Sequence, residues 1–351
     1  MVCFFFDIHN LIYCCVKIVL TRPLLLFSMI SSLLLLQALA FAHFVASSEL
    51  PYLNIDGFAW AENLVFDGLG HMFVAENTNG MVYRINLCNN GTEYCKEIYL
   101  ENGLKKVGGL QVSDDGQVLY AGVTFDDEDE STGIISAPTN GNPSDTYSIF
   151  AKTAYQPNGL AYDITHGYLY YAASDIVYAV NKETQLETVI RGGVKGADGA
   201  WFNPLTNELY IGELFSMQIH VFDTANPITN LGIPASYVGV YTALSNEFGK
   251  THMMDDFTIQ TQSIDTTEVE DVYMYGCDFT GKNVMSFDMS GKHVSQVDLN
   301  KATDGQITEL FNPTSVRYGK GEGFDPSSLY LAEGGGITKR TTNRRVIQLK
   351  V

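Results

Sequence analysis

The sequence predicts an all-β fold, a six-bladed β-propeller, and two observations support this. After residue 50, helical periodicity is hard to find, and short β-forming runs alternate with Gly, Asn, Asp and Pro turn signals. Paired runs then recur six times at a spacing of about 40 to 60 residues, which is the size of a four-stranded blade. The alternative is a β-sandwich with coincidental spacing, and it does not explain why both runs align in every unit.

The first run of each unit is expected to form the innermost strand of a blade. These runs are 62–67, 108–113, 158–163, 198–203, 255–260 and 314–319. Because six inner strands converge on the central channel, their opening residues should form a ring at one mouth. The ring is expected to contain Glu62, Gly108, Asn158, Asp198, Asp255 and Thr314.

The second run of each unit is expected to lie one strand further out. These runs are 71–76, 117–122, 167–172, 207–212, 271–276 and 327–332, each after a turn signal. An antiparallel second strand returns to the same mouth, so Glu76, Glu213 and Glu333 should lie at the rim, mainly solvated. The tail 346–351 has a strand pattern and is expected to close the last blade.

Composition limits the classes of partner. The chain of 351 residues has a formal net charge of −19, which argues against nucleic acid and gives no attraction to anionic lipid. The six blades leave no room for a second large domain after residue 60. We therefore expect residues 47–351 to form the propeller, with a small molecule as its partner; the oligomeric state is left open.

Residues 1–46 differ from the rest because they are mostly apolar, with Lys17 and Arg22 before the longest apolar run. This pattern is typical of a secretory signal peptide. The run is also long enough for an uncleaved signal-anchor. We expect secretion after cleavage, with membrane anchoring as the alternative.

The cysteines outside this leader fit an oxidising compartment. Cys88 and Cys95 flank the turn-like stretch NNGTEY, where a local disulfide is plausible and two free thiols are the alternative. Cys277 is expected to be buried. The same turn holds an N-glycosylation sequon at Asn90.

The ring residues predict a metal site. Three carboxylates and one amide directed at one axis repel and lose hydration, so either their pKa values rise or a cation binds. Oxygen donors without His or Cys favour a hard ion, Ca²⁺ above all; Mg²⁺, Mn²⁺ and Zn²⁺ are alternatives. Another alternative is that these residues are helix caps or solvent-facing turn residues. The predicted ligands are Glu62, Asn158, Asp198 and Asp255.

Asp255 and Asp256 stand side by side at the start of an inner strand. Because side chains alternate faces along a strand, only one should turn inward. We expect this to be Asp255. Asp256 is expected to point away, into the blade edge or a supporting hydrogen bond.

The runs AENLVFDGLGHMFVAE, QPNGLAYD, GADGAWFNP and NPTSVRYG, with LYLAEGGG near the end, resemble the SMP-30/gluconolactonase/LRE-like family of propellers. Paraoxonases and diisopropyl-fluorophosphatases are similar to it in structure. The resemblance covers residues 55–351 and implies one calcium at the channel mouth, held by the four positions above. The family commonly has Asn where this chain has Asp198.

The resemblance implies a calcium-dependent hydrolase of lactones. The metal would act as a Lewis acid and Asp255 as base or nucleophile; pure metal ligation by Asp255 is the alternative. His252, on the loop before Asp255, is a candidate proton shuttle. A phosphotriesterase or arylesterase on the same site, and a non-enzymatic propeller that binds metal and ligand, stay open. Apolar pocket walls are expected from Trp60, Trp201, Phe215 and Phe279, although core packing is the default for each.

Overall fold

The computed structural model describes residues 50–142, 147–241, 252–260, 273–288, 294–335 and 344–351. The predicted leader, residues 1–46, lies outside the described residues. Within the described ranges, none of the helices has the length and hydropathy that a membrane crossing requires. The unit Pro51–Val351 is described here by itself.

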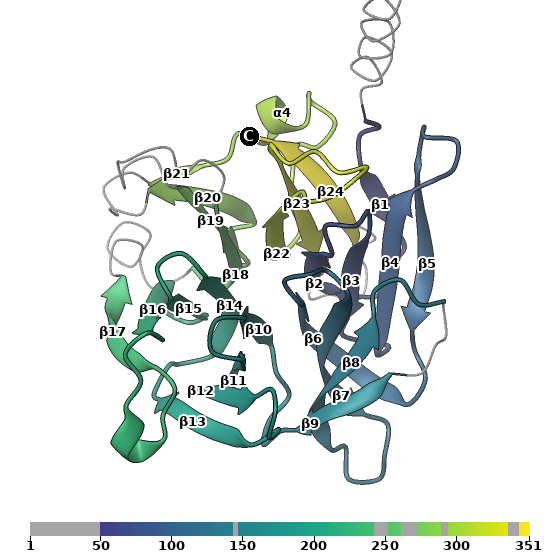
Figure 1. The fold of residues 1–351 in the computed structure, drawn as a ribbon. Helices are drawn as coiled ribbons and strands as arrows, with labels where there is room; N and C mark the ends of the chain where they lie inside the picture. The colour runs from purple at the N-terminus through teal and green to yellow at the C-terminus, as the bar shows by residue number, and fades with distance from the viewer. Residues whose placement is uncertain (1–49, 143–146, 242–251, 261–272, 289–293, 336–343) are drawn as a thin grey trace, which may run out of the picture. The chain divides into compact units, whose positions relative to one another are not determined.

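The fold is an all-β propeller of six four-stranded sheets (Figure 1). Blade 1 contains β2 (Ala61–Phe66), β3 (Met72–Glu76), β4 (Met81–Leu87) and β5 (Tyr94–Leu100), and blade 2 contains β6 (Leu104–Val112), β7 (Val118–Phe125), β8 (Thr132–Pro138) and β9 (Ser148–Lys152). Blade 3 contains β10 (Gly159–Asp163), β11 (Tyr168–Ala173), β12 (Ile176–Asn181) and β13 (Glu187–Gly192), and blade 4 contains β14 (Ala197–Asn203), β15 (Glu208–Glu213), β16 (Gln218–Asp223) and β17 (Ser236–Tyr241). Blade 5 contains β18 (Met254–Ile259), β19 (Tyr273–Asp278), β20 (Asn283–Asp288) and β21 (Val294–Gln296).

Blade 6 is completed from both ends of the unit. Its sheet order is β22 (Pro313–Tyr318), β23 (Ser328–Glu333), β24 (Arg345–Lys350) and β1 (Asn54–Asp56). The expected closing strand near the C-terminus is therefore confirmed. The outermost strand was not predicted: β1 pairs antiparallel with β24, with Asn54 opposite Ile347.

The inner strands β2, β6, β10, β14, β18 and β22 contact one another in a closed ring, each lying against the next and β22 against β2. The predicted first runs are therefore the inner strands, and the predicted second runs are β3, β7, β11, β15, β19 and β23. These strands form because each is rich in β-branched and aromatic residues and is covered on both faces. In β3, β10 and β23, for example, every residue is buried.

The hydrophobic core lies between neighbouring sheets. Val65 and Phe73 of blade 1 pack in one cluster with Leu110 and Val123 of blade 2. The next interfaces are built in the same way, so each sheet shares its two faces with two neighbours. The helical elements of the described residues are short: η1 (Thr229–Leu231) and α4 (Leu299–Ala302).

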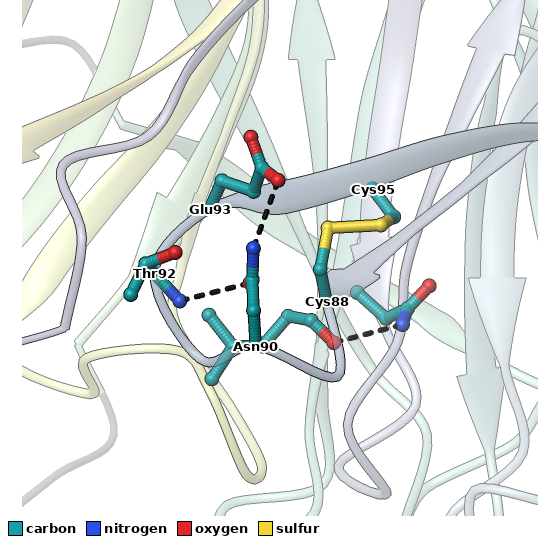
Figure 2. Close-up of a disulfide and its surroundings, with 7 residues drawn as sticks. Cys88, Asn90, Thr92, Glu93 and Cys95 are labelled. Carbon is teal, nitrogen blue, oxygen red and sulfur yellow. Dashed lines mark hydrogen bonds between the residues drawn. A yellow bond between two sulfur atoms is a disulfide. The ribbon is translucent and has the colours of Figure 1, made fainter.

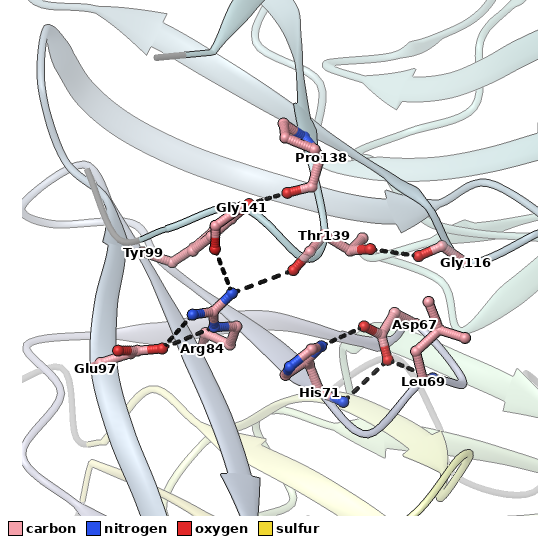
Figure 3. A network of polar contacts seen from close by, with 10 residues as sticks. All are labelled: Asp67, Leu69, His71, Arg84, Glu97, Tyr99, Gly116, Pro138, Thr139 and Gly141. Atoms are coloured by element: carbon pink, nitrogen blue, oxygen red, sulfur yellow. Dashed lines mark hydrogen bonds and ion pairs between the residues drawn. The ribbon is translucent and has the colours of Figure 1, made fainter. Parts of the chain in front are cut away.

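Polar contacts also join blade 1 to blade 2 (Figure 3). The Arg84 guanidinium of β4 donates to the carbonyl oxygen of Gly141 at 2.7 Å and pairs with Glu97 at 2.6 Å. The Tyr99 hydroxyl donates to the carbonyl of Pro138. These bonds fix the outer strands of blade 1 against the loop after β8.

The β4–β5 hairpin contains the predicted disulfide between Cys88 and Cys95 (Figure 2). The turn is closed by the Asn90 side chain, which accepts from the backbone N–H of Thr92 at 3.1 Å and donates to Glu93 at 3.0 Å. Cys277 is fully buried, as expected. Asn90 is exposed, and its glycosylation stays a prediction.

Removal of this disulfide should destabilise the domain. The cysteines are separated by 7 residues, and a loop this short gives an entropic stabilisation of about 2 kcal/mol. We expect the Cys88→Ser, Cys95→Ser double variant to lose about that much free energy of unfolding in urea titrations. The wild type under reducing conditions should match the variant. Equal midpoints for the oxidised and reduced wild type would contradict the prediction.

Candidate functional site

A β-bulge at the start of an inner strand shapes the predicted mouth of the channel. Register shifts occur between Ala61 and Leu64, between Asp198 and Ala200, and between Met254 and Phe257; blades 2 and 6 have comparable shifts. A bulge places two residues opposite one and redirects their side chains. It therefore interrupts the alternation of faces at the positions where the predicted ring begins.

The structure brings together the three predicted carboxylates. Asp198 and Asp255 are 6% and 9% exposed, and their carboxyl groups share a hydrogen bond. Burial, then the charges of Asp198, Glu62 and Asp256, raise the pKa of Asp255 well above its usual range. Burial and the charge of Glu62 do the same to the pKa of Asp198.

Glu62 belongs to the same group of charges. Burial raises its pKa to about 7, and hydrogen bonds from Trp60 and Asn77 oppose that rise. The Trp60 indole N–H donates to Glu62 Oε2. Part of the Glu62 residue is exposed. The three carboxylates therefore form one buried and mutually repelling group.

Asn158 stands immediately before β10, and its backbone N–H donates to the carbonyl of Ala172 at 2.9 Å. Its side-chain Oδ1 faces the inner strand of blade 2: a Cβ added to Gly108 would lie 3.3 Å from this oxygen and 2.5 Å from the carbonyl of Pro157. Gly108 therefore provides room for the loop before β10. It has no side chain that could act as a metal ligand.

Thr314 was expected in the ring but was not among the predicted ligands, and it makes contacts within the protein. Its hydroxyl is fully buried and bonds the carbonyl oxygens of Ala61 at 2.8 Å and Ala332 at 3.1 Å. A β-branched residue at this place joins blade 6 to blade 1. The candidate ligands remain the four predicted ones, Glu62, Asn158, Asp198 and Asp255.

Asp256 was expected to point away, into the blade edge or a supporting hydrogen bond; the supporting hydrogen bonds are present, but the direction away from the channel is wrong. It is 1% exposed, and its Oδ2 accepts from Asn63 at 3.2 Å and from Ser315 at 2.6 Å, and pairs with Arg317 at 2.6 Å. These partners come from the inner strands of blades 1 and 6, so Asp256 lies in the channel. The bulge between Met254 and Phe257 is the physical reason.

Asn63, Asp256, Ser315 and Arg317 are here called the polar plug. The Asn63 side chain also accepts from the backbone N–H of Leu110, so the plug connects four blades. Gly199 makes room for it, because a Cβ there would lie 2.9 Å from Asp256 Oδ1. Sequence reasoning missed Arg317; the available signal was a basic residue inside an otherwise buried inner strand.

His252 lies before β18, and its Nδ1 is 2.5 Å from Asp278 Oδ2. Asp278 ends β19, the second strand of the same blade, and is fully buried. The carboxylate also accepts from the backbone N–H of Gly281 at 2.8 Å. His252 is therefore a half-buried imidazole oriented by a carboxylate at the mouth end of blade 5.

The second-strand acids are not solvated, which corrects our expectation. Glu76, Glu213 and Glu333 are 1%, 6% and 0% exposed. Each has a partner in its own blade: Glu76 accepts from the Asn79 backbone N–H, Glu213 lies 2.8 Å from His220 Nε2, and Glu333 pairs with Arg345. Each therefore stabilises its own blade at the mouth end.

The expected aromatic walls divide between the two ends of the channel. Trp60 and Phe279 lie together near Glu62, with ring centroids 6.2 Å apart, and Phe215 is exposed near Gly196. Trp201 follows Asp198 in β14 but packs against Tyr210 and lines a different cavity. It is therefore not a wall of the carboxylate site.

Among the described residues, no group of three or more His, Cys, Asp or Glu side chains is arranged so that it could hold a metal ion. The hydrogen bonds explain this arrangement in part. Glu62 is turned toward Trp60, and Asp198 and Asp255 bond each other. The carboxylates share one electrostatic environment without forming a ready chelate.

No family model and no curated protein matches this chain. Among solved structures, it is similar to a luciferin-regenerating enzyme (12% identity, TM-score 0.57, 85% of this chain and 93% of the other). It is similar to the calcium-binding protein regucalcin from Agrobacterium tumefaciens (12% identity, TM-score 0.57, 86% of this chain and 96% of the other). It is also similar to an auxiliary nutrient binding protein from Bacteroides thetaiotaomicron (16% identity, TM-score 0.61, 84% of this chain and 69% of the other). At these identities the likeness is one of fold, shared by enzymes and by binding proteins.

Proposed function

We propose that this propeller is a calcium-dependent hydrolase of lactones, acting at the channel mouth. The observation that carries the proposal is the group of three buried carboxylates, Glu62, Asp198 and Asp255, whose pKa values burial and mutual repulsion raise. Such a group gains stability from a divalent cation. Its donors are oxygens, and with the amide of Asn158 they fit Ca²⁺.

These four residues are the ones that would hold the ion. A bound Ca²⁺ would polarise the lactone carbonyl as a Lewis acid. Asp255 is the proposed base or nucleophile, because it is the carboxylate most surrounded by other charges and a raised pKa suits proton transfer near neutral pH. His252, oriented by Asp278, is the proposed proton carrier.

The nearby aromatic pair offers a place for the apolar part of a substrate. Trp60 and Phe279 stand beside Glu62, so a ring bound against them would lie next to the carboxylates. The likeness to the luciferin-regenerating enzyme and to regucalcin is compatible with this function. The likeness to a nutrient binding protein is compatible with binding without turnover.

A panel of lactones, aryl esters and phosphotriesters, assayed with calcium and with EDTA, tests the proposal. We expect lactone turnover that EDTA abolishes, and a loss of about 10³-fold in kcat for Asp255→Asn. The matched control is Asp126→Asn, an exposed carboxylate in the loop after β7, which should leave kcat unchanged.

The other outcomes have distinct meanings. Phosphotriester or aryl ester turnover without lactone turnover would favour the alternative hydrolase at the same site. Calcium binding without turnover of any panel member would favour a binding protein. Full calcium-dependent activity in Asp255→Asn would refute the role assigned to that residue.

A further inference from the structure

A separate cavity of about 280 Å³ lies deeper along the inner strands, and we call it the lower cavity. Its walls include one residue from each inner strand: Val65, Gln111, Tyr162, Trp201, Thr258 and Arg317. Each stands at least three positions after the ring position of its strand. The lower cavity is therefore formed at the end of the channel opposite the carboxylates.

The polar plug lies between the two sites. Asn63, Asp256 and Ser315 occupy the position directly after the ring residue in their strands, and Arg317 reaches Asp256 from the side of the lower cavity. A ligand in the lower cavity would therefore contact Arg317 and would be kept from the calcium-site candidates by the plug.

Only some of the N–H groups of the Arg317 guanidinium are hydrogen-bonded within the protein. Its side chain is 11% exposed. Nη1 forms an ion pair with Asp256 at 2.6 Å and donates to the carbonyls of Phe257 at 2.9 Å and Val316 at 2.7 Å. Within the described part of the chain, Nε and Nη2 have no hydrogen-bond partner. This remaining edge carries two parallel N–H donors, the arrangement that a carboxylate accepts in bidentate fashion.

The walls of the lower cavity limit the chemical nature of the rest of the ligand, the part that carries the carboxylate. Phe66, Tyr162, Trp201 and Tyr318 provide aromatic surface, and flat rings pack well against such walls. Gln111 and Thr258 add polar groups at intervals. The volume of the lower cavity is near the lower limit for a small-molecule pocket. It therefore suits a ligand with a single ring or two fused rings.

Charges of both signs lie around the lower cavity. Lys320 and Asp114 both line the lower cavity and are exposed. Lys182 donates to the Tyr162 hydroxyl at 2.8 Å and adds a further positive charge nearby. Asp256 offsets the charge of Arg317 but occupies only its Nη1.

We propose that the lower cavity is a binding site for small aromatic carboxylates, held by the Nε–Nη2 edge of Arg317 and by the aromatic walls. This site is independent of the proposed hydrolase chemistry, because it lies beyond the plug and needs no metal. Its occupation can therefore be measured in EDTA, whether or not the mouth is catalytic.

The test uses 1-naphthoate, with its uncharged isostere 1-naphthamide as the matched ligand. Calorimetry in EDTA should show saturable binding of naphthoate, and naphthamide should bind at least about 10-fold more weakly. The chain has two tryptophans, of which Trp201 lines the lower cavity. In a Trp60→Phe background, naphthoate should therefore change the remaining fluorescence with the same affinity.

Two variants locate the site. Arg317→Lys keeps a positive charge for Asp256 but removes the planar edge, and should weaken naphthoate at least about 10-fold. Gln111→Tyr places a larger side chain in the cavity from a partly exposed position and should abolish binding. Gln117→Tyr, the same change at an exposed site on blade 2, should leave affinity unchanged.

Equal affinity for naphthoate and naphthamide would overturn the proposal, since it would show an apolar cavity without a carboxylate site. Unchanged affinity in Gln111→Tyr, or no saturable binding up to about 10 mM, would also overturn it. If Arg317→Lys does not fold, the comparison between Gln111→Tyr and Gln117→Tyr still decides.

Discussion

Calcium at about 100 times its dissociation constant is expected to raise the melting temperature by about 5 °C at pH 8, and by much less at pH 5. The reason is competition between the ion and protons for the same carboxylates. The pKa of Glu62 is raised to about 7 by burial, and those of Asp198 and Asp255 are also raised. At pH 5 Glu62 holds its proton in the folded state, and calcium must displace it.

The metal-free protein should show the opposite trend with pH. A carboxyl group with a raised folded-state pKa contributes stability that is present below its unfolded pKa, near 4.5, and is lost as pH rises through the folded value. For Glu62 that window runs from about 4.5 to about 7. The loss would be at most about 3 kcal/mol for this residue, because part of it is exposed to solvent.

Differential scanning fluorimetry between pH 5 and pH 8, with calcium and with EDTA, measures both trends. Magnesium at equal ionic strength should stabilise less, because it demands stricter geometry. Glu62→Gln and Asp198→Asn should each reduce the calcium effect, whereas Asp126→Asn should not. No calcium-specific increase at pH 8, or a larger increase at pH 5, would contradict the site.

Arg317→Met is expected to destabilise the domain by about 3–5 kcal/mol. Asp256 is 1% exposed, and its Oδ1 already has no hydrogen-bond partner within the described residues. Removal of the guanidinium would leave a buried carboxylate supported only by Asn63 and Ser315 among the plug residues. Urea unfolding of the variant measures the loss.

A second variant separates the buried charge from the lost packing. Arg317→Met with Asp256→Asn removes both charges and should recover a large part of the stability, since an uncharged amide costs less to bury. Lys105→Met breaks the exposed pair with Glu130 and should cost less than about 1 kcal/mol. If Arg317→Met lost as little free energy of unfolding as Lys105→Met, the stability of the polar plug would not depend on its ion pair.

The blades were predictable because their signal is local and repeated. Each inner strand and each second strand combines β-forming residues with a turn signal, and the unit recurs at blade spacing. β1 was missed because it has three residues, Asn54–Asp56, and its strand character depends on a partner from the other end of the sequence. Local pattern carries no information about that pairing.

The candidate site was predicted as far as strand register allows. Glu62, Asp198 and Asp255 were placed at the starts of inner strands, and the structure brings these carboxylates together. The supporting hydrogen bonds of Asp256 were expected, but its direction was not, because strict alternation fails at a bulge. The Thr314 hydroxyl bonds two carbonyls instead, a choice that register cannot reveal. The metal and the chemistry stay proposals.

The closure of blade 6 has a consequence for how the chain folds as it is made. β1 leaves the ribosome before the other strands of the propeller, but its partner β24 is the last of them. Until β24 has been synthesised, β1 therefore has an unpaired edge, and blade 6 cannot be completed. Because such edges invite pairing with other chains, a truncation before Arg345 should produce aggregation rather than a smaller soluble propeller.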